Sequence, residues 1–165
     1  MNIQHIETLM YNPFFLSKII QCYLTGYNKE SDLKPIFYVL PIVMYKDSRD
    51  RLNSARSDSS LYSIFSKEVP FKDYNNSKLN SKFSLSQVAE LFDDYIEPTK
   101  MAIIILENNK KIKFSKKIKL TERLEYNKTH PLIRDYFKSA YYLGHILRNI
   151  DINEFEKFLE MKMEA

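Results

Sequence analysis

The sequence predicts a mainly helical α+β fold with a winged helix-turn-helix-like core and a short two-stranded β-wing. Three neighbouring stretches support this prediction. Residues 83–97 have the apolar spacing of an amphipathic helix, Pro98 opens a second apolar segment, and two short alternating runs follow within residues 111–120. Two helices followed directly by a hairpin are typical of a winged helix.

Length and composition favour one domain in a reducing compartment. The chain has 165 residues, so we expect a single domain. Its parts are expected as N-terminal helices with an arginine-rich loop in 12–67, the winged-helix-like unit in 83–120 and C-terminal helices in 129–162, all within domain 1–165. One cysteine, Cys22, excludes an internal disulfide. The chain does not open with a signal-peptide pattern, so we expect a cytoplasmic protein.

Apolar spacing predicts the first two helices. Asn12 is placed to cap a helix that begins at Pro13, and Gly26 is placed to end it. A second run, 36–45, is apolar on every side, which favours a central helix, although its β-branched residues also suit a strand. This run is about half the length of a membrane span. Pro41 should kink the second helix or divide it in two.

Residues 46–60 are polar and are predicted as a loop that carries Arg49, Arg51 and Arg56. Two interpretations stay open. The loop is either a solvated segment with Arg–Asp pairs, or a docking segment for a partner subunit or a phosphate backbone, which the fork of a guanidinium suits. A short helix is expected within 59–67. The stretch after it, 70–82, is rich in Asn, Ser and Lys and is predicted as a loop.

The predicted winged-helix unit begins with a helix that Ser84 or Ser86 caps. Pro98 should start the second helix, which we expect over 99–108. Because this segment is rich in β-branched residues, a hairpin is an alternative, and the choice between helix and strand for 101–106 stays open.

The wing is predicted from the alternation of apolar and charged residues between Lys111 and Leu120. Ile112 and Phe114 share one face with Ile118 and Leu120. The outward and turn positions carry six lysines, namely Lys110, Lys111, Lys113, Lys116, Lys117 and Lys119.

Two more helices are expected near the end of the chain. A long one should begin at His130-Pro131, and Gly144 within it predicts close approach of another backbone, because a mid-helix glycine costs about 1 kcal/mol relative to alanine. A short amphipathic helix over 153–162 carries Phe155, Phe158 and Leu159 and should leave an apolar face for a partner.

The sequence lacks the residue groups that catalysis requires, so we expect no enzyme, no cofactor and no metal. The three histidines stand far apart, and two glycines cannot supply a glycine-rich phosphate loop. Cys22 is expected to be structural. A cluster of acidic residues is best explained as the solvated side of one helix, and it comprises Glu90, Asp93, Asp94 and Glu97.

The wing lysines have two explanations of about equal weight. They can neutralise phosphates without reading sequence, or they can keep an exposed edge strand from aggregating. The helix before the wing offers Thr99 and Lys100 and then only apolar residues, whereas a base-reading helix exposes polar residues in its first turns. We therefore expect a scaffold or protein-docking unit with, at most, a non-specific contact to double-stranded DNA.

Several short motifs, in their order along residues 12–149, carry a resemblance to a known family. They are Asn12-Pro13, Leu40-Pro41, Arg49 with the small polar run after it, Pro98-Thr99, and Ala140 with Leu143-Gly144. The chain resembles the middle component of three-component ABC systems, the small accessory subunit encoded with an SMC-like ABC ATPase and an effector in Lamassu-type bacterial anti-phage defence. Tyr62 matches an aromatic that the family often has, whereas Asn53 stands near a position where proline is frequent.

The resemblance implies a non-catalytic subunit, without membrane contact, that bridges the ATPase and an effector nuclease in antiviral defence. The residues expected to dock partners are Arg49, Arg51, Arg56, Tyr62, Phe155, Phe158 and Leu159. Those expected to contact nucleic acid are Lys111, Lys113, Lys116, Lys117 and Lys119. The alternative function is a free-standing winged-helix DNA-binding regulator.

Overall fold

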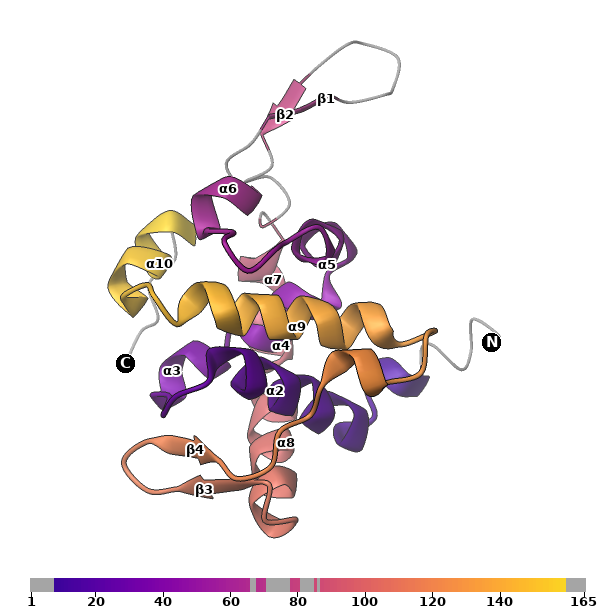
Figure 1. Ribbon diagram of the computed structural model, residues 1–165, viewed down its shortest axis with the longest axis vertical. Coiled ribbons are helices and arrows are strands. Elements are labelled where there is room, and N and C mark those ends of the chain that lie inside the picture. Colours follow the sequence, from indigo (N-terminus) through magenta and orange to yellow (C-terminus); the bar gives the residue numbers. More distant parts are fainter. Residues whose placement is uncertain (1–7, 66–67, 71–77, 81–84, 86, 160–165) are drawn as a thin grey trace.

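Two helices that lie far apart in the sequence, α2 (Pro13–Tyr27) and α9 (Arg134–Leu147), pack side by side at the centre of the molecule (Figure 1). The computed structural model describes residues 8–65, 68–70, 78–80, 85 and 87–159. A Cβ atom at Gly144 would lie 2.1 Å from the carbonyl oxygen of Tyr23, and one at Gly26 would lie 1.9 Å from that of Tyr141. The predicted close approach at Gly144 is confirmed. The two glycines of the sequence thus allow the two backbones to touch.

The start of α2 is as predicted, and its end is not. The side-chain oxygen of Asn12 accepts hydrogen bonds from the N–H groups of Phe14 and Phe15, at 2.9 and 3.2 Å. The helix does not stop at Gly26. It runs on to Asn28, whose left-handed φ of 54° and N–H bond to the Leu24 carbonyl end it. Asparagine tolerates this conformation, whereas Gly26 is used for packing.

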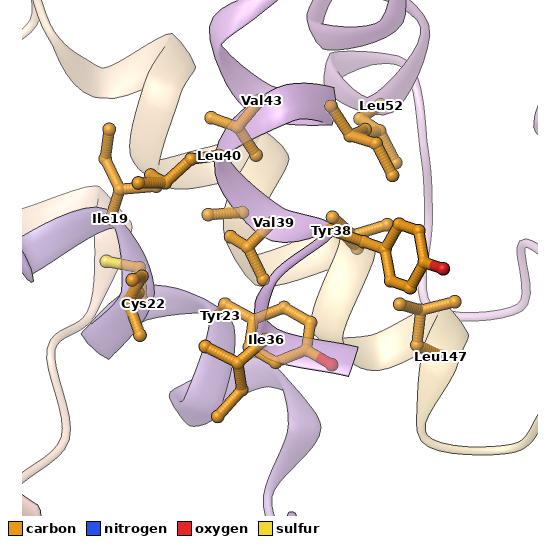
Figure 2. Close-up of a cluster of buried hydrophobic side chains, with 14 of the residues drawn as sticks. Ile19, Cys22, Tyr23, Ile36, Tyr38, Val39, Leu40, Val43, Leu52 and Leu147 are labelled. Carbon is orange, nitrogen blue, oxygen red and sulfur yellow. The ribbon is translucent and has the colours of Figure 1, made fainter. Parts of the chain in front are cut away.

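The run 36–45 is helical and lies in the core, in two pieces. Helix α3 (Leu33–Ile36) is followed by α4 (Val39–Met44). The break falls at 37–38 rather than at Pro41, which sits in the first turn of α4, where a missing N–H removes no hydrogen bond. Figure 2 shows this segment packed against residues of α2, α5 and α9. Its labelled core members are Ile19, Cys22, Tyr23, Ile36, Tyr38, Val39, Leu40, Val43, Leu52 and Leu147.

The prediction of a loop over residues 46–60 is wrong in its first half, which forms helix α5 (Lys46–Asn53). Tertiary contacts explain the difference, because Ser48 and Leu52 are buried one turn apart. The Ser48 hydroxyl also donates to the carbonyls of Ile42 and Tyr45, which ties α5 to the end of α4. The short helix expected within 59–67 is confirmed as α6 (Leu61–Phe65).

Two paired strands include residues 70 and 78–80 of the stretch 70–82, which was predicted to be a loop, and the rest of that stretch lies outside the described residues. Strand β1 (Glu68–Pro70) pairs antiparallel with β2 (Lys78–Asn80), with Val69 opposite Leu79. The sequence pattern predicted a loop because Asn, Ser and Lys are frequent here and only two apolar residues mark the paired strands. The proposed caps Ser84 and Ser86 lie outside the described residues.

The helix–helix–hairpin order of residues 88–120 is present. Helix α7 (Val88–Asp94) leads into α8 (Ile96–Asn108), so residues 101–106 are helical and the hairpin alternative is excluded. Strand β3 (Ile112–Phe114) pairs antiparallel with β4 (Ile118–Leu120). The predicted class, mainly helical with a small two-stranded antiparallel sheet, is confirmed.

Two helices close the described part of the chain, and both contribute side chains to the core. A 3-10 turn, η2 (Tyr126–Lys128), precedes α9, which begins at Arg134 rather than at His130. Helix α10 (Ile152–Leu159) follows, and the last residues expected for it lie outside the described ones. One buried cluster joins side chains from Phe15 to Phe158. In the described parts of the chain, no helix combines the length and the apolarity needed to cross a bilayer.

Candidate partner and nucleic-acid surfaces

The wing is held to the body of the protein by backbone hydrogen bonds. Ser31, in the connection between α2 and α3, donates to the Ile118 carbonyl at 2.9 Å and accepts from the Ile118 N–H at 2.8 Å. Strand β4 therefore has neighbours on both sides, whereas β3 forms the outer edge. Ile112 and Ile118 are buried beneath the hairpin, which fixes the lysines on its outer side.

The predicted wing lysines differ in how their charges are balanced. Lys111 pairs with Glu122, and the Lys117 ammonium lies 3.7 Å from the Asp32 carboxylate. The other three, Lys113, Lys116 and Lys119, are exposed and form no ion pair with any described residue. Because Lys113 lies opposite Lys119 across the strands, the wing concentrates positive charge that is not neutralised within the described chain.

Helix α8 is buried on one side only. Ala102, Ile103 and Leu106 face the core. On the opposite side, Met101 and Ile104 are each 50% exposed. These two side chains, one helical turn apart, define the α8 surface. The sequence did not reveal it, because an uninterrupted apolar run does not show which side faces the core.

Arg49 is engaged within the chain. Its guanidinium donates to the carbonyls of Val43 and Met44, at 3.0 and 3.1 Å, and lies 4.2 Å from the centre of the Tyr136 ring. The contacts satisfy carbonyl groups at the end of α4 and join α5 to α9. The fork geometry of arginine is used here for helix capping.

Arg51, Arg56 and Tyr62 lie at the surface near the junction of α5 and α6. The two arginines line a hollow of about 460 Å³ together with serine side chains and Asp58. Tyr62 is 51% exposed, and its hydroxyl donates to Glu154 at 3.3 Å. We call these three residues the arginine surface. Helices α5 and α6 lie on the other side of the central α2 and α9 helices from the wing (Figure 1).

A family comparison matches nearly the whole chain. Residues 1–163 fit the family described as ABC-three component (ABC-3C) system Middle Component 3. The chain belongs to this family. A three-component ABC system implies partnership of this middle component with the ABC ATPase component. No curated protein and no solved structure matches the chain.

Helix α10 of this middle component is anchored to the core. Phe155 packs edge-on against Tyr38, and Phe158 packs edge-on against Tyr62, so both rings are buried within the chain rather than left on an open face. Leu159 is partly buried. The buried carboxylate of Glu156 accepts a hydrogen bond from the Tyr38 hydroxyl at 2.9 Å and an ion pair from Lys34 at 2.8 Å. Burial and this carboxylate raise the pKa of Tyr38 well above its ordinary value.

Cys22 and His145 of the middle component each contact a backbone carbonyl within the chain. Cys22 is buried, its thiol donates to the Leu124 carbonyl at 3.2 Å, and burial raises the pKa of the thiol. A ring nitrogen of His145 lies 2.6 Å from the Ser57 carbonyl. Among the residues that the structure describes, no three His, Cys, Asp or Glu side chains group as a metal site would need.

Proposed function

We propose that this middle component is a non-catalytic accessory subunit that bridges an SMC-like ABC ATPase and an effector nuclease in a cytoplasmic, Lamassu-type anti-phage defence complex. Residues 1–165 form one domain in this proposal, with a winged-helix-like unit in 83–120. The main support is the presence of two different surfaces on opposite sides of the central α2 and α9 helices (Figure 1). A bridging subunit needs two such surfaces.

The α8 surface is proposed to bind the ABC ATPase. Met101 and Ile104 present apolar area without a cover, and methionine adapts its shape to a partner. The wing begins four residues after α8 ends, so a protein that covers α8 brings any DNA that it holds close to the wing lysines. Lys111, Lys113, Lys116, Lys117 and Lys119 are proposed to contact the DNA backbone without sequence specificity.

The arginine surface is proposed to bind the effector. Arg56 offers an exposed guanidinium group and Arg51 a partly buried one for an acidic partner surface, and Tyr62 adds an aromatic ring. Phe158, also expected to dock partners, packs edge-on against Tyr62 and supports its ring. Arg49 and Phe155 contact Tyr136 and Tyr38 within the chain, and Leu159 is partly buried against the core.

The alternative of a free-standing DNA-binding regulator receives less support from α8. A helix that reads bases needs exposed polar residues in its first turns. Thr99 is buried, and the Lys100 ammonium is paired with Glu97 at 2.8 Å. The next exposed side chains on that face, Met101 and Ile104, lack hydrogen-bonding groups for base edges.

Co-purification of the tagged subunit with the ATPase and effector of its own system tests the bridge. We expect the pair of changes Met101→Lys and Ile104→Lys to release the ATPase and keep the effector, because charges enter an apolar contact. Conversely, Arg51→Glu with Arg56→Glu should release the effector and keep the ATPase.

Glu90→Lys, an exposed change on α7, is the matched control and should keep both partners. Retention of both partners by both double variants contradicts the two surfaces. Loss of both partners from either double variant, with an unchanged melting temperature, indicates a single shared interface and contradicts the bridge.

A further inference from the structure

A hollow of about 590 Å³ lies between the wing and the end of α8. Four lysines line it, Lys110, Lys113, Lys117 and Lys119, and Phe114 contributes its ring. Its volume falls within the roughly 300–1,000 Å³ range of small-ligand sites in proteins. Phe114 lines the hollow from the inner face of the hairpin, and the long side chains of Lys113 and Lys119 reach it from the outer face.

Phe114 is unusually exposed for its place in the hairpin. It shares a face with Ile112, which is 2% exposed, and stands opposite the buried Ile118, yet 44% of Phe114 is open to solvent. The reason is its position just before the turn at 115–117, beyond the part of the hairpin that packs on the body. Its ring makes no aromatic or cation contact with the described residues. The ring is therefore available to a ligand.

The hollow carries a surplus of positive charge. Lys110, Lys113 and Lys119 form no ion pair with a described residue, and Lys117 has only the distant partner Asp32. Two carboxylates, Glu30 and Glu107, also line the hollow. With Asp32 beside Lys117 included, four ammonium groups face three carboxylates, so the site is net positive and suits an anion. The carboxylates can accept hydrogen bonds from amino groups.

Lysines around an exposed aromatic ring are the combination by which proteins hold single-stranded nucleic acid, since the cations follow the phosphates and the ring stacks on a base. Bases inside a duplex are already stacked on each other, so Phe114 gains nothing from them. We propose that the hollow beside the wing binds an unpaired nucleotide of single-stranded DNA, with the base on Phe114 and the phosphates near Lys113 and Lys119. This rests on the DNA contact of the proposed function and makes it selective for unpaired strands.

Fluorescence anisotropy with the full chain tests the proposal, using a labelled single strand and the blunt duplex of the same sequence. The wild type should bind the single strand more tightly. Phe114→Leu keeps an apolar side chain but removes the ring, so it should weaken single-strand binding about tenfold and leave duplex binding unchanged. Lys113→Gln with Lys119→Gln should weaken both and lower the salt dependence.

Tyr62→Leu, which removes an exposed ring at the other end of the molecule, is the matched control and should change neither affinity. The proposal is overturned if the wild type binds no single strand, if it binds the duplex at least as tightly, or if Phe114→Leu binds the single strand like the wild type. Co-purification of Phe114→Leu with the ATPase and effector separates the two proposals, because the bridge can hold while single-strand binding fails.

Discussion

The α2–α9 crossing and the α8–wing end are both helical and apolar, but they differ in how much space their side chains have. At the crossing, the backbones approach so closely that a methyl group would overlap a carbonyl oxygen. On α8, two large apolar side chains are half exposed, and beside it Phe114 stands open. The crossing specifies the fold and has no room for an added atom, whereas the exposed side chains at the other end have free space around them and are suited to binding.

Gly144→Ala should have the largest effect on stability. Its Cβ would lie 2.1 Å from the Tyr23 carbonyl oxygen, and backbone atoms cannot move aside as a side chain can. We expect a loss of about 3 kcal/mol in the free energy of unfolding, despite the higher helix propensity of alanine. Urea denaturation measures it, with Lys138→Ala on the same helix as the control. A stability equal to that of the wild type would mean that α2 and α9 do not touch.

Raising the pH into the alkaline range should have the second largest effect on the free energy of unfolding. Burial raises the pKa of Tyr95 to about 12, and burial also raises the pKa values of Tyr23 and Cys22. The unfolded chain loses these protons at lower pH than the folded one, so the free energy of unfolding is intact below about pH 9 and falls as pH rises further. Each group contributes a slope of at most about 1.4 kcal/mol per pH unit.

Tyr95→Phe isolates one of these groups. Its stability should fall less steeply than that of the wild type between pH 10 and about 12, the interval set by the ordinary and the raised pKa of Tyr95. Thermal or urea denaturation at several pH values measures the slopes. Parallel curves for the two proteins would show that Tyr95 titrates alike in the folded and unfolded states.

Arg49 and Arg51 lie on the same helix, α5, but Arg49 makes contacts within the chain whereas Arg51 belongs to the arginine surface. Arg49→Lys should lose about 1–2 kcal/mol of stability, because an ammonium cannot both reach two carbonyls and stack on Tyr136. Arg51→Lys should leave stability within about 0.5 kcal/mol of the wild type. Equal losses in the two variants, measured by urea denaturation, would place both arginines in the same role.

Lys119→Glu should give the smallest effect. Because Lys113 and Lys119 face each other across the strands, the change replaces a like-charge pair by an opposite pair and should raise stability by about 0.5 kcal/mol. Lys116→Glu, placed in the turn, serves as the comparison and should change stability less. A clear loss of stability in Lys119→Glu would show that the wing is more tightly packed than its exposure indicates.

The sequence predicted elements whose signals are local. Asn12-Pro13 places the start of α2, and strict alternation places the wing, because a cap and a pleat each depend on a few neighbouring residues. The prediction was wrong where a contact between residues far apart in the sequence determines the local structure. Helix α5 depends on Ser48 and Leu52 reaching the core, and Gly26 makes room for α9 instead of ending α2.

The candidate surfaces were predicted unevenly for the same reason. Charge is visible in a sequence, so the wing lysines and the arginines could be named. Exposure is a tertiary property, so the open sides of Met101, Ile104 and Phe114 could not be seen in runs that read as uniformly apolar or as the inner face of a hairpin. The nearness of Phe114 to the turn was the one local signal that could have indicated its exposure.

The bonds between Ser31 and Ile118 have a mechanical consequence. On the β3 side of the hairpin, Lys111 donates its N–H to the carbonyl of Leu106, in the last turn of α8, at 2.8 Å. A DNA strand that pulls on the tip of the wing therefore meets a hairpin whose base is fixed on both sides. A force on the tip is transmitted through Ser31 to the end of α2 and through Lys111 to α8. Both helices belong to the core, and α8 also carries the surface proposed to bind the ATPase.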